Sequence, residues 1–237
     1  MAAADGITTI VATPHMKEGA YVNERDAIGR SVETLQQQIS SEGIPLTLRI
    51  GCEVYLAPDL PEGVRAGRLA TLGDTGTHML LELPHRQQPV AVEETVFALV
   101  VAGIVPVLAH PERILWFQED PERLVRLIEL GCLAQLTANS LTGAFREDVR
   151  ALSESMIRRR MIHFIASDAH DLRYRPPVMS AARARVEAIA GELHADALCR
   201  GNAARLLAGE PIEAPPPEPA GRSGAGLGGF WRRFTGQ

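Results

Sequence analysis

The 237-residue chain has few of the features that mark secreted, zinc-knuckle or membrane proteins. It contains only three cysteines, Cys52, Cys132 and Cys199, and their wide spacing fits neither a disulfide framework nor a zinc knuckle. No apolar run approaches the length needed to cross a bilayer, and residues 1–6 lack the basic start of a signal peptide. We therefore expect a cytoplasmic protein without a transmembrane segment.

Basic residues are also in deficit, with 24 lysines and arginines against 29 acidic residues and a formal net charge of −5 at pH 7. This balance offers no cationic surface for a phosphate backbone, so nucleic acid is not an expected partner. Hydrophobic residues make up 46% and charged residues 22%, which are ordinary values for a globular protein. A chain of this length fits one large α/β domain.

Short apolar strands alternate with helical patterns along most of the chain. Strands are expected at residues 7–11, 46–50, 79–83, 105–109, 133–136 and 162–166. Helices are expected at residues 24–41, 90–102, 121–129, 146–158, 177–193 and 195–207, and residues 2–6 fit a helix end closed by Gly6. The alternation predicts parallel β/α units. Residues 1–209 should form one domain, and residues 210–237, rich in proline and glycine, a flexible tail.

Acidic residues and histidines recur where the predicted strands end: His15, Glu53, Glu82, His110, Asp168 and His170. In a β/α barrel these ends share one face, so the six side chains should converge. Any one of them alone is more often a surface or hydrogen-bonded residue than a ligand, but their joint placement favours a metal site. Asp168 and His170 are two residues apart, so on an extended segment they point the same way and can share one cation. The mixture of imidazoles and carboxylates favours manganese, iron or zinc.

Two arginines follow the histidines at these strand ends. Arg113 and Arg175 are expected to hold a phosphate group in bidentate fashion near the metals. Glu112, beside Arg113, either positions that arginine or binds metal. Cys52 is interpreted as a small buried residue and not as a nucleophile, because no histidine lies near it in sequence. The remaining histidines are interpreted as structural or solvated: His78, His85, His163 and His194.

A series of motifs in fixed order resembles a known family. The motifs are Thr13-Pro14-His15, Gly51-Cys52-Glu53, Leu81-Glu82-Leu83-Pro84, Ala109-His110-Pro111-Glu112-Arg113, Asn139-Ser140-Leu141-Thr142-Gly143 and Ala166-Ser167-Asp168-Ala169-His170, continued by Arg175-Pro176-Pro177 and Asn202. Together they resemble the capsule-type protein-tyrosine phosphatases of the polymerase and histidinol phosphatase (PHP) superfamily. The resemblance covers residues 6–207, and the order of the motifs is far more specific than any one of them.

The resemblance implies a distorted PHP-type (β/α)7 barrel with a multinuclear cluster of Mn²⁺, or of iron or zinc. It implies that His15, Glu53, Glu82, His110, Asp168 and His170 are metal ligands and that Arg113 and Arg175 contact phosphate. The implied activity is that of a phosphoric monoester hydrolase in which a metal-bound hydroxide attacks phosphotyrosine. The implied partner is a bacterial tyrosine kinase of polysaccharide export, and the implied role is control of capsule and exopolysaccharide synthesis.

The sequence departs from the family pattern at its start. The family opens with a strand that ends in Asp-x-His-x-His, soon followed by another aspartate, and residues 1–6 contain no such motif. We therefore expect the first strand, two histidines and a carboxylate to be missing, which predicts an open barrel edge and reduced stability and activity. A misassigned start or a shortened chain explains this better than degeneration of the gene.

Two other functions fit the same residues. One is a small-molecule phosphoesterase of the superfamily, for example one that acts on histidinol phosphate. The other is an inactive regulatory module that binds phosphotyrosine through Arg113 and Arg175. The sequence leaves the oligomeric state open.

Overall fold

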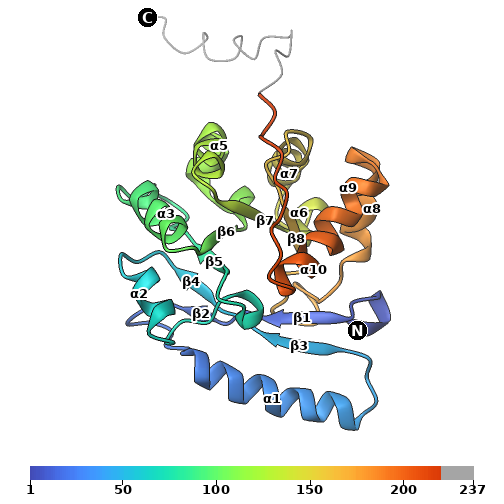
Figure 1. Ribbon diagram of the computed structural model, residues 1–237. Coiled ribbons are helices and arrows are strands. Elements are labelled where there is room, and N and C mark those ends of the chain that lie inside the picture. Colours follow the sequence, from blue (N-terminus) through green and yellow to red (C-terminus); the bar gives the residue numbers. More distant parts are fainter. Residues whose placement is uncertain (220–237) are drawn as a thin grey trace, which may run out of the picture.

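The computed structural model describes residues 1–219, and these form a curved parallel sheet with helices around it (Figure 1). The strands are β1 (Thr9–Ala12), β2 (His15–Met16), β3 (Thr47–Ile50), β4 (Glu53–Tyr55), β5 (His78–Glu82), β6 (Val105–Ala109), β7 (Leu133–Thr137) and β8 (Phe164–Ala166). β1 pairs with β3, and β2-β4-β5-β6-β7-β8 form a six-stranded sheet in which every pairing is parallel. The predicted α/β class with a parallel sheet is confirmed.

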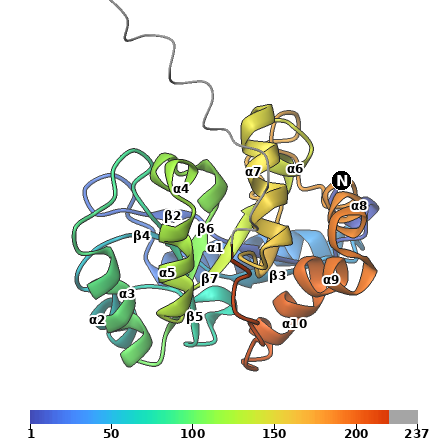
Figure 2. The ribbon, with the colours of Figure 1, turned by 90° about the horizontal axis from the view of Figure 1, so that it is seen from above.

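The helices between the strands lie mostly on the outer side of the curved sheet (Figures 1 and 2). The longer ones are α1 (Arg25–Ser41), α3 (Val92–Val101), α5 (Glu122–Glu129), α7 (Glu147–Arg158) and α8 (Ser180–Ala190). Shorter elements complete the fold: η1 (Ala3–Asp5), α2 (Leu60–Arg65), η2 (Leu72–Asp74), η3 (Pro111–Arg113), α4 (Leu115–Glu119), α6 (Ala138–Leu141), α9 (Glu192–Asp196), the π-helical turn η4 (Ala197–Gly201) and α10 (Asn202–Leu207). Among the described residues, no helix combines the length and apolar character needed to span a membrane.

The two-stranded sheet continues into the six-stranded sheet through a bend. Thr9 pairs with Thr47 in β1–β3 and His15 pairs with Glu53 in β2–β4, so the register offset is the same on both sides of the break. At the break the backbone of Gly51 approaches the neighbouring strand so closely that an added Cβ would lie 2.6 Å from Val11 Cγ1. Glycine is therefore needed where the strand bends, and the bend carries Glu53 into the next sheet.

Alternate residues of the central strands feed two separate apolar clusters. On β5, for example, Leu81 packs in the larger cluster beneath the helices, whereas Leu80 packs in a smaller one on the other face of the sheet. The same alternation places Leu108 in the larger cluster and Val107 in the smaller. A parallel sheet buried on both faces requires such apolar strands, and Glu82 on β5 shares the inner side with Leu80.

The inner face is covered by the end of the described chain. Leu206 of α10 belongs to the smaller cluster, and Ile212 packs against it. Further on, the Glu218 backbone makes two hydrogen bonds with Arg159: its N–H donates to Arg159 O at 2.8 Å, and its carbonyl accepts from the Arg159 side-chain Nε at 3.0 Å. Residues 210–219, predicted as the start of a tail, thus run along the domain. The rest of the predicted tail, residues 220–237, lies outside the described residues.

Several predicted boundaries shift in the structure. The helix expected at residues 195–207 is interrupted by the π-helical turn, and the helix expected from residue 177 begins at Ser180. Glu53 follows β3 as predicted but also opens a further strand, β4, because the chain bends at Gly51 and pairs again. Within residues 1–219, β8 pairs with β7 alone and β1 with β3 alone, so the strands form an open curved sheet.

Candidate metal centre

Four of the six predicted ligands converge on neighbouring strands: His15 and Glu53 open the short strands β2 and β4, Glu82 ends β5, and His110 follows β6. His15 Nδ1 lies 3.3 Å from Glu82 Oε2 and 3.7 Å from Glu53 Oε2. His110 Nε2 lies 3.0 Å from Glu53 Oε1. Ligand atoms of His15, Glu53 and Glu82 lie within 4.8 Å of one another, which is close enough for one cation to contact all three. The expected convergence of these four residues is therefore present in the structure.

The pairing of the strands explains this convergence. His15 on β2 is the register partner of Glu53 on β4, and Glu82 on β5 pairs with Tyr55, two residues beyond Glu53. His110 directly follows β6, the next strand of the sheet. The four side chains thus come from four adjacent strands at the edge where active sites of parallel α/β proteins are built.

Glu53 and His110 form a buried pair with exposed fractions of 3% and 4%. Burial acts to raise the pKa of the Glu53 carboxyl, but the His110 hydrogen bond, the His110 charge and the charges of nearby histidines outweigh it, so that pKa is lowered. Burial acts to lower the pKa of His110, but the hydrogen bond and charge of Glu53 raise it overall. Each partner therefore favours the charged form of the other.

The remaining donors fit a divalent cation. Burial, and then the charge of Glu53, raises the pKa of Glu82, because two carboxylates share a small space. The Nδ1 atoms of His15 and His110 are buried and have no hydrogen-bond partner within the described residues. A cation bound here would neutralise the paired carboxylates and take up imidazole lone pairs, which are the donors that zinc, iron and manganese accept.

Asp168 lies at the same edge of the sheet, but its carboxylate pairs with two arginines. Its Oδ2 accepts hydrogen bonds from Arg113 Nη1 at 3.0 Å, from Arg175 Nη2, and from Thr137 Oγ1 at 3.3 Å. The two arginines predicted to bind phosphate thus meet at one carboxylate. A guanidinium has five N–H donors, and Arg175 Nε is buried without a partner among the described residues, so donors remain for an anionic ligand.

His170 stays close to Asp168, although the backbone there is not extended as expected. Asp168 has φ 49°, in the left-handed region, and His170 Nδ1 lies 2.9 Å from the Asp168 carbonyl oxygen and 3.8 Å from its Oδ1. The His170 and His15 ring centroids are 6.1 Å apart, which places His170 beside the four-residue cluster. His110 also has positive φ, 37°, and such strain in non-glycine residues is common at functional sites.

Glu112 acts as a tether for the turn after β6. It is fully buried, and its Oε1 accepts hydrogen bonds from Thr137 N at 3.1 Å and Ser140 Oγ at 2.7 Å. Burial raises the pKa of this carboxyl. These bonds fix the His110–Arg113 turn to the end of β7, so the geometry supports the positioning role for Glu112 over metal binding.

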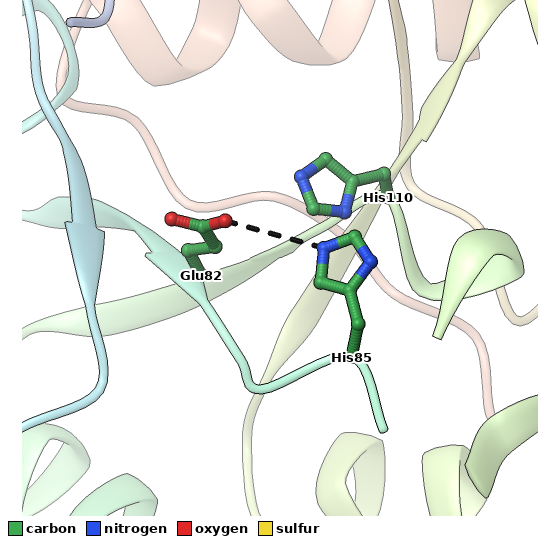
Figure 3. Close-up of side chains that lie close together, drawn as sticks. All are labelled: Glu82, His85 and His110. Atoms are coloured by element: carbon green, nitrogen blue, oxygen red, sulfur yellow. Dashed lines mark ion pairs between the residues drawn. The ribbon is translucent and has the colours of Figure 1, made fainter. Parts of the chain in front are cut away.

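One histidine of this cluster was missed from the sequence. His85, predicted to be structural or solvated, lies with Glu82 and His110 in a second group whose ligand atoms are within 4.8 Å of one another. Figure 3 shows the three side chains pointing toward a common point. Its position three residues after Glu82 could have indicated it as a candidate. It was passed over because His85 follows Pro84 in a loop and does not end a strand.

The other sequence candidates do not take part in this cluster. His78 is buried with its Nδ1 2.9 Å from Thr77 Oγ1, and His163 Nδ1 accepts a hydrogen bond from Ala134 N at 3.0 Å, so both have structural partners. The Cys52 thiol is fully buried and lies 3.2 Å from Pro14 O. Burial and the charge of Glu53 raise the pKa of this thiol to about 12, so it is protonated at neutral pH and is a poor nucleophile.

Comparison with proteins of known structure or function identifies relatives that cover most of this chain. Tyrosine-protein phosphatase YwqE of Bacillus subtilis is 36% identical over 170 residues, which are 72% of this chain and 66%, just under two thirds, of YwqE. Tyrosine-protein phosphatase CpsB of Streptococcus agalactiae is 25% identical over 207 residues, 85% of each chain.

The fold has a close structural counterpart as well. A chain from the crystal structures of YwqE from Bacillus subtilis and CpsB from Streptococcus pneumoniae, described as unique metal-dependent tyrosine phosphatases, superposes with a TM-score of 0.89. It is 34% identical in sequence, and the match covers 93% of this chain and 89% of that one. The family described as "Capsular polysaccharide synthesis, CpsB/CapC" matches residues 1–208. The chain therefore belongs to the CpsB/CapC family of capsular polysaccharide synthesis.

Proposed function

We propose that this protein is a metal-dependent protein-tyrosine phosphatase that acts in the control of capsule or exopolysaccharide synthesis. The observation that carries the proposal is the meeting of His15, Glu53, Glu82 and His110 beside the arginine pair Arg113 and Arg175. A cation site next to anion-binding guanidinium groups is what hydrolysis of a phosphate monoester requires. The relatives named as tyrosine phosphatases support the same reaction.

The ligand roles proposed from the sequence agree with this geometry. His15, Glu53, Glu82 and His110 would hold divalent cations directly, and Asp168 and His170 border them. When bound, such cations polarise the phosphoryl oxygens and supply a nucleophile from water near neutral pH. We propose manganese as the working metal, with iron or zinc as alternatives, because the set mixes carboxylates with imidazoles.

Arg113 and Arg175 would orient and neutralise the phosphoryl group. Both already converge on Asp168 Oδ2, so a phosphate placed between them and the carboxylates would find donors on one side and cations on the other. Arg113 is fixed further by the Phe145 ring, 4.7 Å from its guanidinium carbon. Pre-positioned donors of this kind stabilise the charge that develops in the transition state.

Exposed aromatic residues near the site support a protein substrate. Tyr21 is 57% exposed with its ring centroid 5.9 Å from that of His15, and Tyr174, next to Arg175, is 70% exposed. Aromatic side chains at the rim can pack against a phosphotyrosine ring and its flanking residues. We propose a bacterial tyrosine kinase of polysaccharide export as the physiological partner.

A direct comparison of substrates tests this function. With manganese supplied, we expect turnover of a phosphotyrosine peptide to exceed that of histidinol phosphate. Arg175→Lys should lower kcat about 10²- to 10³-fold, because one preorganised donor group is lost. Arg123→Lys, on α5, serves as the matched control and should keep full activity. Preference for histidinol phosphate would contradict the substrate class, and peptide binding without turnover would favour a regulatory module.

A cysteine variant tests the chemistry separately. Cys52→Ser should retain at least about half of the activity, because the buried thiol is protonated at neutral pH and the proposed reaction does not use it. Loss of turnover in this variant with metal content unchanged would point to thiol chemistry. Initial rates and metal analysis on the same sample distinguish the two results.

We also propose that residues 1–209 form the phosphatase domain and that the curved sheet belongs to a distorted (β/α)7 barrel. In support, the family match covers residues 1–208, and one further strand between β8 and β1 would join the edges left open within residues 1–219. A cytoplasmic location is supported by Cys52, Cys132 and Cys199, which are all free thiols, as in a reducing compartment.

A further inference from the structure

His85 lies where a cation could bind it together with two residues of the proposed centre. Its ring centroid is 5.2 Å from that of His110, and its Nε2 is 4.0 Å from Glu82 Oε1. That distance is longer than a hydrogen bond, so the pair leaves room for an ion between the two groups. Figure 3 shows the His85 ring and the Glu82 carboxylate directed toward each other, with His110 beside them.

The backbone that carries His85 is fixed in this position. Trp116 Nε1 donates a hydrogen bond to Pro84 O at 2.8 Å, and Leu115 N donates one to His85 O at 2.9 Å. Trp116 is 2% exposed, and Leu83, just before the turn, is fully buried. The loop after β5 is therefore anchored to α4 on both sides of the His85 side chain, as in a ligand that is held ready to bind.

The His85 side chain itself remains accessible. It is 39% exposed, whereas the His110 side chain is 5% exposed and the Glu82 side chain 17%. A cation arriving from solvent would meet His85 first and then find Glu82 and His110 behind it. Two imidazoles and one carboxylate form the donor set of many catalytic zinc and non-haem iron sites, which keep open positions for other ligands.

We propose that His85 is a metal ligand and that Glu82, His85 and His110 hold a cation of their own, with Glu82 shared with the position formed by His15, Glu53 and Glu82. The two positions differ in chemistry. The position formed by Glu82, His85 and His110 has two imidazoles and suits borderline ions such as Zn²⁺, Fe²⁺ and Co²⁺. The position formed by His15, Glu53 and Glu82 has two carboxylates and suits Mn²⁺ better. The proposal extends the metal dependence proposed above, but it concerns binding alone and does not require tyrosine phosphatase activity.

Titration of the metal-free full-length chain with Co²⁺ tests the assignment. Co²⁺ reports its own ligands through its visible absorption, and isothermal calorimetry gives the affinity. We expect His85→Ala and His85→Gln to weaken Co²⁺ binding at this position by at least about 10- to 100-fold, the loss that follows even from removal of a partner that only orients a ligand. Mn²⁺ affinity should change much less, because His15, Glu53 and Glu82 remain.

His194→Gln provides the matched control, since it removes an imidazole from α9 and should leave Co²⁺ binding unchanged. His85 is partly exposed, so its variants should keep the circular dichroism spectrum and melting temperature of the parent chain. Wild-type Co²⁺ affinity and spectrum in both His85 variants would overturn the proposal, as would a parent chain that binds no Co²⁺. A parent that binds Co²⁺ through His85 but releases no phosphate from phosphotyrosine would sustain this inference and contradict the proposed function alone.

Discussion

The first 50 residues and the strands β5–β8 are stabilised by different kinds of contact. In the first 50 residues, Ala2 and Ile28 are the only buried apolar side chains, and a hollow of about 590 Å³ lies between α1 and β3. In β5–β8, by contrast, apolar side chains are buried on both faces of the sheet. Burial of apolar surface is the main source of stability, so the two regions should contribute unequally to it.

Polar contacts take the place of apolar packing in the first region. Arg25 makes two hydrogen bonds to Asp74, at 2.8 and 2.7 Å, and Asp5 accepts hydrogen bonds from Met179 N and Ser180 N at the start of α8. His15 belongs to this region, whereas Glu82 and His110 belong to the densely packed one. The proposed metal centre therefore joins the densely packed region to the region held by polar contacts, and its affinity depends on both.

The largest expected difference between the regions comes from truncating one leucine in each. Leu108→Ala, on β6 and fully buried, should lower the free energy of unfolding by about 2–5 kcal/mol because it leaves a cavity. Leu35→Ala, on α1 and 48% exposed, should change it by no more than about 0.5 kcal/mol. Urea unfolding of both variants measures the difference, and equal losses would show that the comparison is wrong.

A buried histidine provides a pH test of the dense region. Burial, and then the charge of His194, lowers the pKa of His163 from 6.5 to about 4, so the folded state holds this ring neutral. As pH falls below 6.5, His163 is protonated in the unfolded chain before it is protonated in the folded chain. The stability that the neutral ring provides is therefore complete above pH 6.5, and the free energy of unfolding falls by roughly 3 kcal/mol in total as pH drops toward 4. His163→Gln, which does not titrate, should show a correspondingly smaller loss of stability between pH 6.5 and 4.

The comparison with His163→Gln is made on metal-free protein, because acid also removes bound metal. Denaturant unfolding at several pH values gives the slope for each chain. Identical slopes for the parent and His163→Gln would mean that His163 titrates normally in the folded state.

The bend at Gly51 tests how the two regions are joined. Gly51→Ala places a Cβ 2.6 Å from Val11 Cγ1 and 3.1 Å from Thr13 Cγ2, so we expect a loss of about 1–3 kcal/mol and weaker metal binding through His15. Gly29→Ala, on α1, meets only Ile50 Cδ1 at 3.5 Å and should stabilise the chain by about 0.5–1 kcal/mol. Thermal unfolding of the two variants compares them directly, and a stable Gly51→Ala chain with normal metal affinity would refute the role of the bend.

The smallest expected effect concerns the contact that ties the start of the chain to α8. Asp5→Ala removes the acceptor for Met179 N, Ser180 N and Ser180 Oγ, and should cost about 1 kcal/mol, as for loss of a helix cap. Burial acts to raise the pKa of Asp5, but these hydrogen bonds lower it overall from 3.8. The stabilisation by the ionised Asp5 carboxylate should therefore be present above pH 3.8 and be lost as pH falls through the lower pKa of the folded state. A constant difference between the two chains down to strongly acidic pH would contradict this account.

Local pattern was sufficient for much of the fold. The strand at residues 105–109 has the predicted bounds, and α1, α5 and α7 begin within one residue of their predicted starts, because apolar periodicity and glycine or proline boundaries are local signals. The second halves of the two bent strands were missed, since two- and three-residue strands carry too little periodicity. α2 was missed because Pro61 and Gly63 lie inside it and lower its helical propensity.

The sequence predicted part of the candidate site, and only the tertiary structure revealed the rest. The sequence alone determined the strand–helix alternation and the convergence of His15, Glu53, Glu82 and His110, because parallel strands bring the residues near their ends to one edge of the sheet. Only the structure showed that His15 and Glu53 open two further short strands. Only the tertiary structure showed that Asp168 pairs with the two arginines. Only the fold brought His85 beside Glu82 and His110, because a loop side chain takes its direction from packing and long-range hydrogen bonds, and no residue spacing encodes these.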